Sequence, residues 1–145
     1  MPSGCSSVVE RLVANEKVEG STPFTRSNNY IEDKMTELYK KKCVACDGSI
    51  PAFEIDEIHN YLKKIDGWDV KKNDKSSYFL IKEFKFQNFI ESQNFVNNVS
   101  FIAEEEGHHP DISFGWGYCK IKIFTHAIKG LAESDFILAA KIDKI

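Results

Sequence analysis

One stretch near the C-terminus, residues 118–126, constrains the fold most, because its apolar and polar residues alternate. In an extended strand, successive side chains point to opposite faces. One predicted face carries Cys119, Ile121, Ile123 and Thr125, and the opposite face carries Lys120, Lys122, Phe124 and His126. We therefore expect a strand here, with His126 on the same face as charged side chains.

Turn signals divide the β-prone sequence into two hairpins. Gly115 and Gly117 indicate a tight or bulged connection between the alternating strand and the strand before it. Earlier in the chain, residues 73–74 mark a turn between a short strand at 68–70 and a β-prone run at 76–86. Four strands are predicted.

Three further segments favour helices. The first has isoleucine or leucine at steps of three, four and three over 55–65, which lines one helix face, and Gly67 is expected to end it. A longer helix is predicted over 87–106 and stops at Gly107, and a third over 130–143.

The predicted order is α-β-β-α-β-β-α. Hairpin-joined strands with amphipathic helices imply an α+β fold, a two-layer sandwich in which a four-stranded antiparallel sheet carries three helices on one face. The other face is then partly bare. Because natural proteins seldom leave such a surface or an edge strand uncovered, we expect a homodimer or homotetramer.

The chain is long enough for one domain, at 145 residues. Residues 1–34 show no sustained helical or strand period of apolar residues and are expected to be a disordered N-terminal extension. The composition changes at Met35, which reads like a natural start of the protein. Residues 35–49 form an N-terminal segment with the motif CVAC, and residues 50–145 form the folded domain.

Charge and hydropathy exclude several classes of function. A net charge of -3 provides no basic field for nucleic acid. No apolar run approaches the roughly 18 to 20 residues that span a bilayer, and the N-terminus does not resemble a signal peptide, so we expect a cytoplasmic protein without a membrane partner. In that compartment Cys5, Cys43, Cys46 and Cys119 are expected to be free thiols.

Cys43 and Cys46 have the spacing of metal ligands or of a redox pair. A zinc site needs two further ligands, and the chain has no second CxxC motif. The strand-to-helix context of a thioredoxin motif is also missing. No metal is expected.

Three histidines, His108, His109 and His126, lie within nineteen positions. Because imidazole titrates near neutral pH, such a group beside a carboxylate can give and take protons without a metal. Glu104 lies one helical turn before His108 and could accept a hydrogen bond from an imidazole. Pro110 restricts His109 to extended geometry and holds both imidazoles at a fixed corner.

Each of these residues also has a purely structural interpretation. Histidines at a helix end often only cap carbonyls, and Glu104 lies in an acidic run that is typical of a solvated helix end. Asp135 could be a favourable charge in a first helical turn, and Trp116 could be a core residue.

The segment AEEEGHHPDISFGWGYCKIKIFTHAIKGLAESD resembles the signature of the pterin-4a-carbinolamine dehydratase family. The matched positions are Glu104, His108, His109, Pro110, Trp116, His126 and Asp135. The resemblance extends over roughly residues 50–145. One departure is Ala132, where family members commonly have a capping Ser or Thr, and its loss costs about 1 kcal/mol of helix stability.

The resemblance implies dehydration of 4a-hydroxytetrahydropterin to quinonoid dihydropterin, in tetrahydropterin recycling, with no cofactor. It assigns proton transfer to His108 and His126, and orientation of the pterin to His109. The carboxylates Glu104 and Asp135 would hold these catalytic histidines, while Pro110 and Trp116 would join His109 in substrate binding.

Two alternatives remain open. A metal-dependent hydrolase could use His108, His126 and Glu104 as an open three-ligand site. A non-catalytic dimerisation or binding module of the same fold would not need the histidines at all. The dehydratase interpretation requires the three imidazoles to converge on a common cleft.

Overall fold

The computed structural model describes residues 37–44 and 47–145, which belong to one compact unit. The predicted N-terminal extension and Cys46 lie outside the described residues. No helix of the described part is long and apolar enough to cross a membrane.

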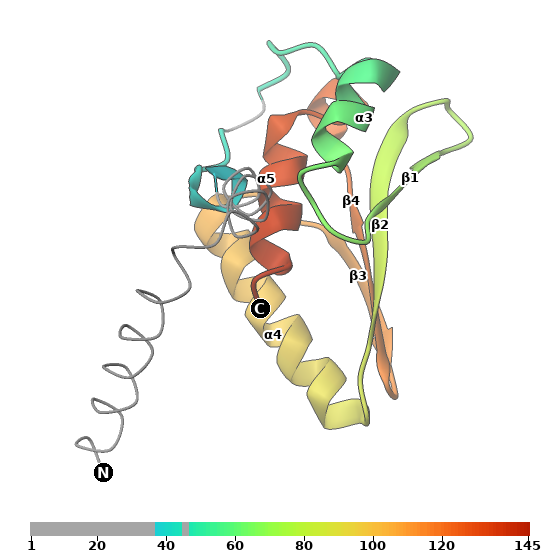
Figure 1. Ribbon diagram of the computed structural model, residues 1–145, viewed down its shortest axis with the longest axis vertical. Helices are drawn as coiled ribbons and strands as arrows, with labels where there is room; N and C mark the ends of the chain where they lie inside the picture. The colour runs from blue at the N-terminus through green and yellow to red at the C-terminus, as the bar shows by residue number, and fades with distance from the viewer. Residues whose placement is uncertain (1–36, 45–46) are drawn as a thin grey trace, which may run out of the picture. The chain divides into compact units, whose positions relative to one another are not determined.

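Four antiparallel strands form a single open sheet (Figure 1). Their bounds are β1 Asp69–Lys72, β2 Tyr78–Lys85, β3 Asp111–Gly115 and β4 Tyr118–Ile123. The order in the sheet is β1-β2-β4-β3, so the two predicted hairpins join through β2 and β4. The register pairs Leu80 with Ile123 and Asp111 with Lys122.

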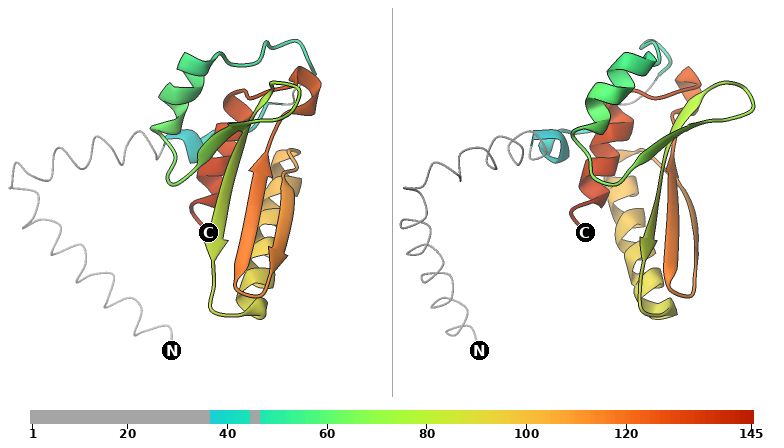
Figure 2. Two further views of the ribbon diagram at one scale, coloured as in Figure 1. Left: turned by 90° about the vertical axis from the view of Figure 1, so that its right-hand side faces the viewer. Right: turned by 45° about the vertical axis from the view of Figure 1, so that its right-hand side comes forward.

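Within residues 47–145, the helices α3, α4 and α5 cover one face of this sheet (Figure 2). Their bounds are α3 Ile55–Leu62, α4 Phe89–Glu106 and α5 Glu133–Ile142. The predicted α+β class and element order are confirmed, with a short 3₁₀ helix, η1 His126–Ile128, added between β4 and α5.

Two predicted boundaries differ from the structure. The first helix ends at Leu62, and Gly67 lies five residues later in the left-handed region, at φ 66°. The intervening turn is closed by hydrogen bonds such as Lys64 N to Tyr61 O. The alternating strand ends at Ile123, and His126 begins η1 instead of ending the strand.

The core lies between the helices and the inner face of the sheet. Cys119, Ile121 and Ile123 are fully buried and Thr125 is 4% exposed, as the alternation predicts, while Lys120 faces solvent on the opposite face. α5 is enclosed more than its amphipathic pattern suggests, because eight of its ten residues are buried. It therefore has neighbours on nearly every side.

Candidate active site

His108 forms a buried pair with Asp135. α4 ends at Gly107, whose left-handed conformation turns the chain, and the His108 N–H donates to the Ala103 carbonyl at 3.1 Å. His108 Nε2 lies 2.8 Å from Asp135 Oδ1, with side-chain exposures of 14% and 0%. Since a carboxylate oxygen is an acceptor, this contact assigns the donor role to Nε2, and Nδ1 is then the ring nitrogen that can accept a hydrogen bond.

Asp135 also binds two other groups through its second oxygen. Oδ2 accepts from Thr125 Oγ1 at 2.8 Å and from the Ala132 N–H at 2.8 Å. The bond to Ala132 provides part of the helix cap that Ala132 cannot make with its own side chain. A buried carboxylate needs donors to offset its lost hydration, and here they come from the end of α4, the end of β4 and the start of α5.

His109 pairs with Glu104 at 2.7 Å between Nε2 and Oε1. The sequence placed Glu104 within reach of an imidazole, with His108 one turn away, and the structure shows that the imidazole it contacts is that of His109. Both side chains are well exposed, at 61% and 78%. An exposed pair of this kind contributes little stability and leaves His109 accessible.

His126 lies on a short loop that is tied at its base. Thr125 and Gly130 pair through two backbone hydrogen bonds of 3.0 and 3.3 Å. The exposed His126 ring meets the Phe124 ring edge-on, with centroids 4.9 Å apart. Phe124 follows the buried Ile123, so the alternation places its side chain on the opposite, helix-free face of the sheet, and the His126 ring lies beside it.

A hollow of about 620 Å³ adjoins His126 on that side of the sheet. Polar, charged and aromatic side chains of the β1–β2 turn, the start of β3, the end of β4 and η1 surround it: Asn73, Asp74, Lys75, Ser77, Asp111, Lys122, Phe124, His126 and Lys129. Hollows of this size accommodate small molecules. None of its lysines or aspartates forms an ion pair within the described part of the chain.

The three histidines gather at one end of the β3–β4 hairpin. His108 and His109 precede β3, and His126 follows β4, while the Asp135–Thr125 bond links the two sides. Their rings have different surroundings, however: His108 pairs with Asp135 in the first turn of α5, and the hollow's lining includes His126 and Asp111 but neither His108 nor His109. Convergence on one cleft therefore stays a prediction.

Pro110 and Trp116 occupy opposite ends of β3. Pro110 is half-buried immediately before the strand. Trp116 lies in the two-residue turn between β3 and β4 and is 72% exposed, so within one chain it borders neither the histidines nor the core. Gly117 has a φ of 76°, and a Cβ there would lie 3.0 Å from the Phe86 carbonyl oxygen, which explains why this turn needs glycine.

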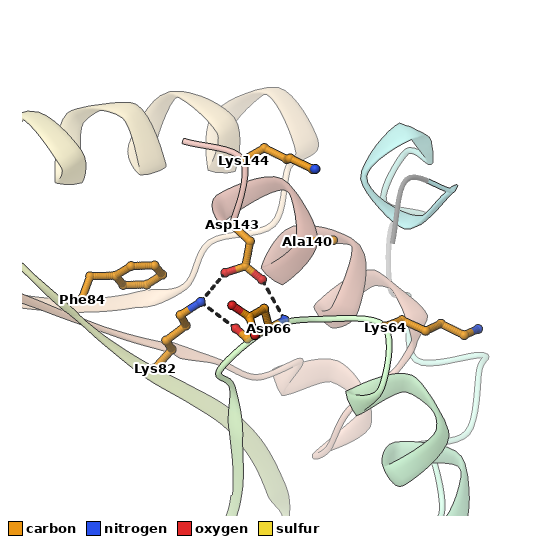
Figure 3. Close-up of a pocket in the computed structure, with 7 residues that line it drawn as sticks. All are labelled: Lys64, Asp66, Lys82, Phe84, Ala140, Asp143 and Lys144. Atoms are coloured by element: carbon orange, nitrogen blue, oxygen red, sulfur yellow. Dashed lines mark hydrogen bonds and ion pairs between the residues drawn. The ribbon is translucent and has the colours of Figure 1, made fainter. Parts of the chain in front are cut away.

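A second hollow, of about 150 Å³, is lined by residues whose hydrogen bonds hold the fold together (Figure 3). Lys82 donates to Asp143 Oδ1 at 2.7 Å and to the Asp66 carbonyl at 2.6 Å, and Trp68 Nε1 donates to the same Asp143 carboxylate. These bonds fasten the end of α5 to the sheet. Figure 3 shows the Lys64 side chain pointing away from this group.

The three-ligand set proposed for a hydrolase is not assembled. Glu104 contacts His109, and within residues 37–44 and 47–145 no three His, Cys, Asp or Glu side chains lie together as metal ligands would. Burial raises the pKa of the Cys43 thiol to about 12, with the nearby Glu106 carboxylate adding to the effect, so this thiol stays protonated at neutral pH.

Sequence reasoning missed Thr125 and Asp111 as site residues. The alternation had placed Thr125 on the buried face, and a buried hydroxyl needs a partner, so that signal was available. Asp111 carried no comparable signal, because its place at the hollow depends on how β3 and the β1–β2 turn meet.

The fold and these contacts define the class of protein. It is a small α+β protein whose two histidine–carboxylate pairs lie where α4, the β3–β4 hairpin and α5 meet. Residues 51–145 match the family model of pterin 4 alpha carbinolamine dehydratase, and the chain belongs to that family.

Individual relatives agree. A Rubrobacter xylanophilus protein, provisionally named pterin-4-alpha-carbinolamine dehydratase, is 45% identical over 111 residues, covering 77% of this chain and 100% of its own. A protein with the same name from Alkaliphilus metalliredigens is 46% identical over 111 residues, 76% of this chain and 96% of its own. The crystal structure of a transcriptional coactivator/pterin dehydratase from Brucella melitensis matches with a TM-score of 0.58 at 26% identity, over 64% of this chain and 96% of that one.

Proposed function

We propose that this protein is a 4a-hydroxytetrahydropterin dehydratase. The observation that carries the proposal is the family match over residues 51–145, together with the His108–Asp135 pair inside the matched region. Relatives that share over 40% of their residues with this chain are provisionally named for the same dehydratase. The product would be a quinonoid dihydropterin.

The reaction needs an acid and a base. Hydroxide is a poor leaving group, so the oxygen on C4a has to gain a proton while N5 loses one and its electron pair expels water. General acid–base catalysis of such a step contributes about 10²- to 10⁴-fold. We assign these proton transfers to His108 and His126. Asp135 fixes the ring of His108 and its protonated nitrogen, and His109, paired with Glu104, orients the pterin.

The hollow beside His126 is the candidate place for the pterin ring, and the roles given to His108 and His109 require the substrate to extend from it past the start of β3, because neither of these histidines lines the hollow. Phe124 offers an aromatic edge to a flat heterocycle. The amino and amide N–H groups on the pyrimidine side of a pterin match a carboxylate acceptor, and Asp111 lies in this hollow without an ion-pair partner in the described part of the chain. Pro110 directly precedes Asp111 and fixes the start of the strand.

The test is kinetic. His108→Ala and His126→Ala should each lower kcat about 10²-fold or more with purified protein and synthetic 4a-hydroxytetrahydropterin. The matched control is His59→Ala, because His59 is exposed on α3, away from the site. Wild-type turnover in both site variants would refute the assignment, and circular dichroism would verify that each variant is folded.

The same variants separate the enzyme from a binding module. A coactivator role, of the kind named for the Brucella relative, should survive loss of the histidines, whereas dehydration should not. The recycling role and tetrahydrobiopterin as the particular substrate stay predictions from the family resemblance, and the cytoplasmic location stays a prediction from the hydropathy of the sequence.

A further inference from the structure

Residues 37–44 lie across the two helix ends that hold the His108–Asp135 pair (Figure 1). Leu38 anchors this segment, since its side chain is 2% exposed and belongs to the core. The segment precedes the residues matched by the family model, which begin at 51. Its hydrogen bonds to the helices, including the ion pair of Lys41, are made at the C-terminal end of α4 and the N-terminal end of α5, while Tyr39 also lies beside Lys144 after α5.

At the end of α4, the contact is with Glu106. The Cys43 N–H donates to Glu106 Oε2 at 2.8 Å, and Lys141 of α5 donates to Oε1 of the same carboxylate. The Glu106 side chain is 4% exposed. Glu106 is the last residue of α4, and only Gly107 separates it from His108. The position of Glu106 therefore helps to fix the position of the His108 backbone, two residues further along the chain.

At the start of α5, the contacts are with the two residues before Asp135. Ser134 Oγ accepts from the Val44 N–H at 3.2 Å and donates to the Val44 carbonyl at 3.1 Å. The Cys43 thiol donates to the Ser134 carbonyl at 3.4 Å, and Lys41 pairs with Glu133 at 2.7 Å. The helix start that carries Asp135 is thus bonded to the same short segment as the helix end that precedes His108.

We propose that residues 37–44 act as a positioning brace for the His108–Asp135 pair, through Glu106 and Ser134. Its catalytic consequence rests on the proposed dehydratase function, whereas its structural consequence does not. One hydrogen bond joins His108, after the end of α4, to Asp135, in the first turn of α5. A small shift of either helix end therefore changes the length of this bond. Since a misplacement of about 1 Å can cost about 10²-fold in rate, a loosened pair should lower kcat.

The first test compares Glu106→Ala with Glu105→Ala in the full chain. Glu105 is the exposed neighbour on the same helical turn, so it makes a matched control. NMR of protein labelled with ¹⁵N-histidine would follow solvent exchange of the His108 Nε2 proton. We expect at least tenfold faster exchange in Glu106→Ala and an unchanged rate in Glu105→Ala. In the dehydratase assay, kcat should fall about tenfold in Glu106→Ala with KM nearly constant.

The second test uses Ser134, which also decides the matter should Glu106→Ala not fold. Ser134→Ala removes the hydroxyl that bonds to Val44, and Ser134→Thr retains it. Exchange of the His108 proton should accelerate in the alanine variant and return toward the wild-type rate in the threonine variant. A folded alanine variant with wild-type exchange would show that the segment only adds stability, and would overturn the brace. A wild-type protein without dehydratase activity would instead refute the proposed function, because the exchange measurement needs no substrate.

Discussion

At Asp135, one fully buried carboxylate meets donors from three parts of the chain, His108, Thr125 and Ala132. Each donor restricts the carboxylate further, so the ring it holds should occupy one orientation. A residue so completely bonded is sensitive to the loss of any one partner, since a buried acceptor left without its donor costs about 1–3 kcal/mol.

Thr125→Val tests this sensitivity. Valine has nearly the shape of threonine but cannot donate to Asp135 Oδ2, so we expect a loss of about 1–3 kcal/mol in the free energy of unfolding. We also expect a lower kcat, because His108 would lose part of its support. Urea denaturation and the dehydratase assay measure the two effects. Ser100→Ala is the control, since its exposed hydroxyl donates to the Val96 carbonyl within α4, and stability equal to wild type in Thr125→Val would contradict the role given to Asp135.

At the residue scale, the motif named His108 and Asp135, which the structure brings into a hydrogen bond, and the alternation placed Thr125 inward, where it is buried. Their roles in catalysis stay predictions. The partner of Glu104 could not be chosen from spacing, because it depends on the left-handed turn at Gly107. The position of Trp116 could not be predicted either, since spacing along the motif does not reveal that a whole strand separates it from His109.

Among the elements, α5 is held from several directions. Glu106 of α4 and Lys141 of α5 form an ion pair with little exposure, at 4% and 18%. Burial acts to raise the pKa of Glu106, but the Cys43 N–H and the Lys141 ammonium outweigh it, and the pKa lies below its ordinary value of 4.5. The ionised carboxylate therefore stabilises the folded state.

This lowered pKa predicts a pH dependence of stability. The ionised Glu106 side chain should contribute fully to the free energy of unfolding above about pH 5. That contribution should be lost as the pH falls from 4.5, the ordinary pKa, through the lower pKa of Glu106 in the folded protein. Glu106→Gln should be less stable than wild type by about 1–3 kcal/mol at pH 7, and the two stability curves should converge on acidification. Denaturation at a series of pH values measures this. Glu105→Gln is the matched control, and parallel curves for wild type and Glu106→Gln would contradict the prediction.

The elements were predictable where a period was sustained and less so at their ends. Steps of three and four residues marked α3, but its end at Leu62 depends on the turn that follows. Alternation marked β4 but continued in the sequence beyond Ile123, where the pairing of Thr125 with Gly130 redirects the backbone into η1. The alternation of apolar and polar residues does not predict the pairing of Thr125 with Gly130.

On the whole molecule, apolar surface remains uncovered on α4. Ile90 and Phe101 are 62% and 68% exposed, and their spacing of three helical turns places them on one face of the helix. Large exposed apolar side chains are candidate contacts for a protein partner, although exposed asparagines, such as Asn94 and Asn97, lie between these two. The homodimer or homotetramer stays a prediction, and α4 and the helix-free sheet face are its candidate interfaces.

Phe101→Glu tests the contribution of α4 to self-association. A charge at the centre of an apolar contact is costly to bury, so we expect a smaller assembly at the same concentration, measured by analytical ultracentrifugation. Glu105→Lys also changes charge on the exposed surface of α4 and serves as the control. An unchanged sedimentation coefficient for Phe101→Glu would place any interface elsewhere, for example on the bare face of the sheet.

The burial of Asp135 limits how the candidate site could be transferred to another protein. All the histidines assigned here, with their acidic partners, fall within one contiguous segment, residues 104–135. That segment supplies the outer hairpin and two helix ends but neither β2, the strand to which β4 pairs, nor most of α5. A synthetic peptide of those residues would contain the candidate histidines and carboxylates without the strand and helix that position them, so moving the site to another protein requires the surrounding domain as well.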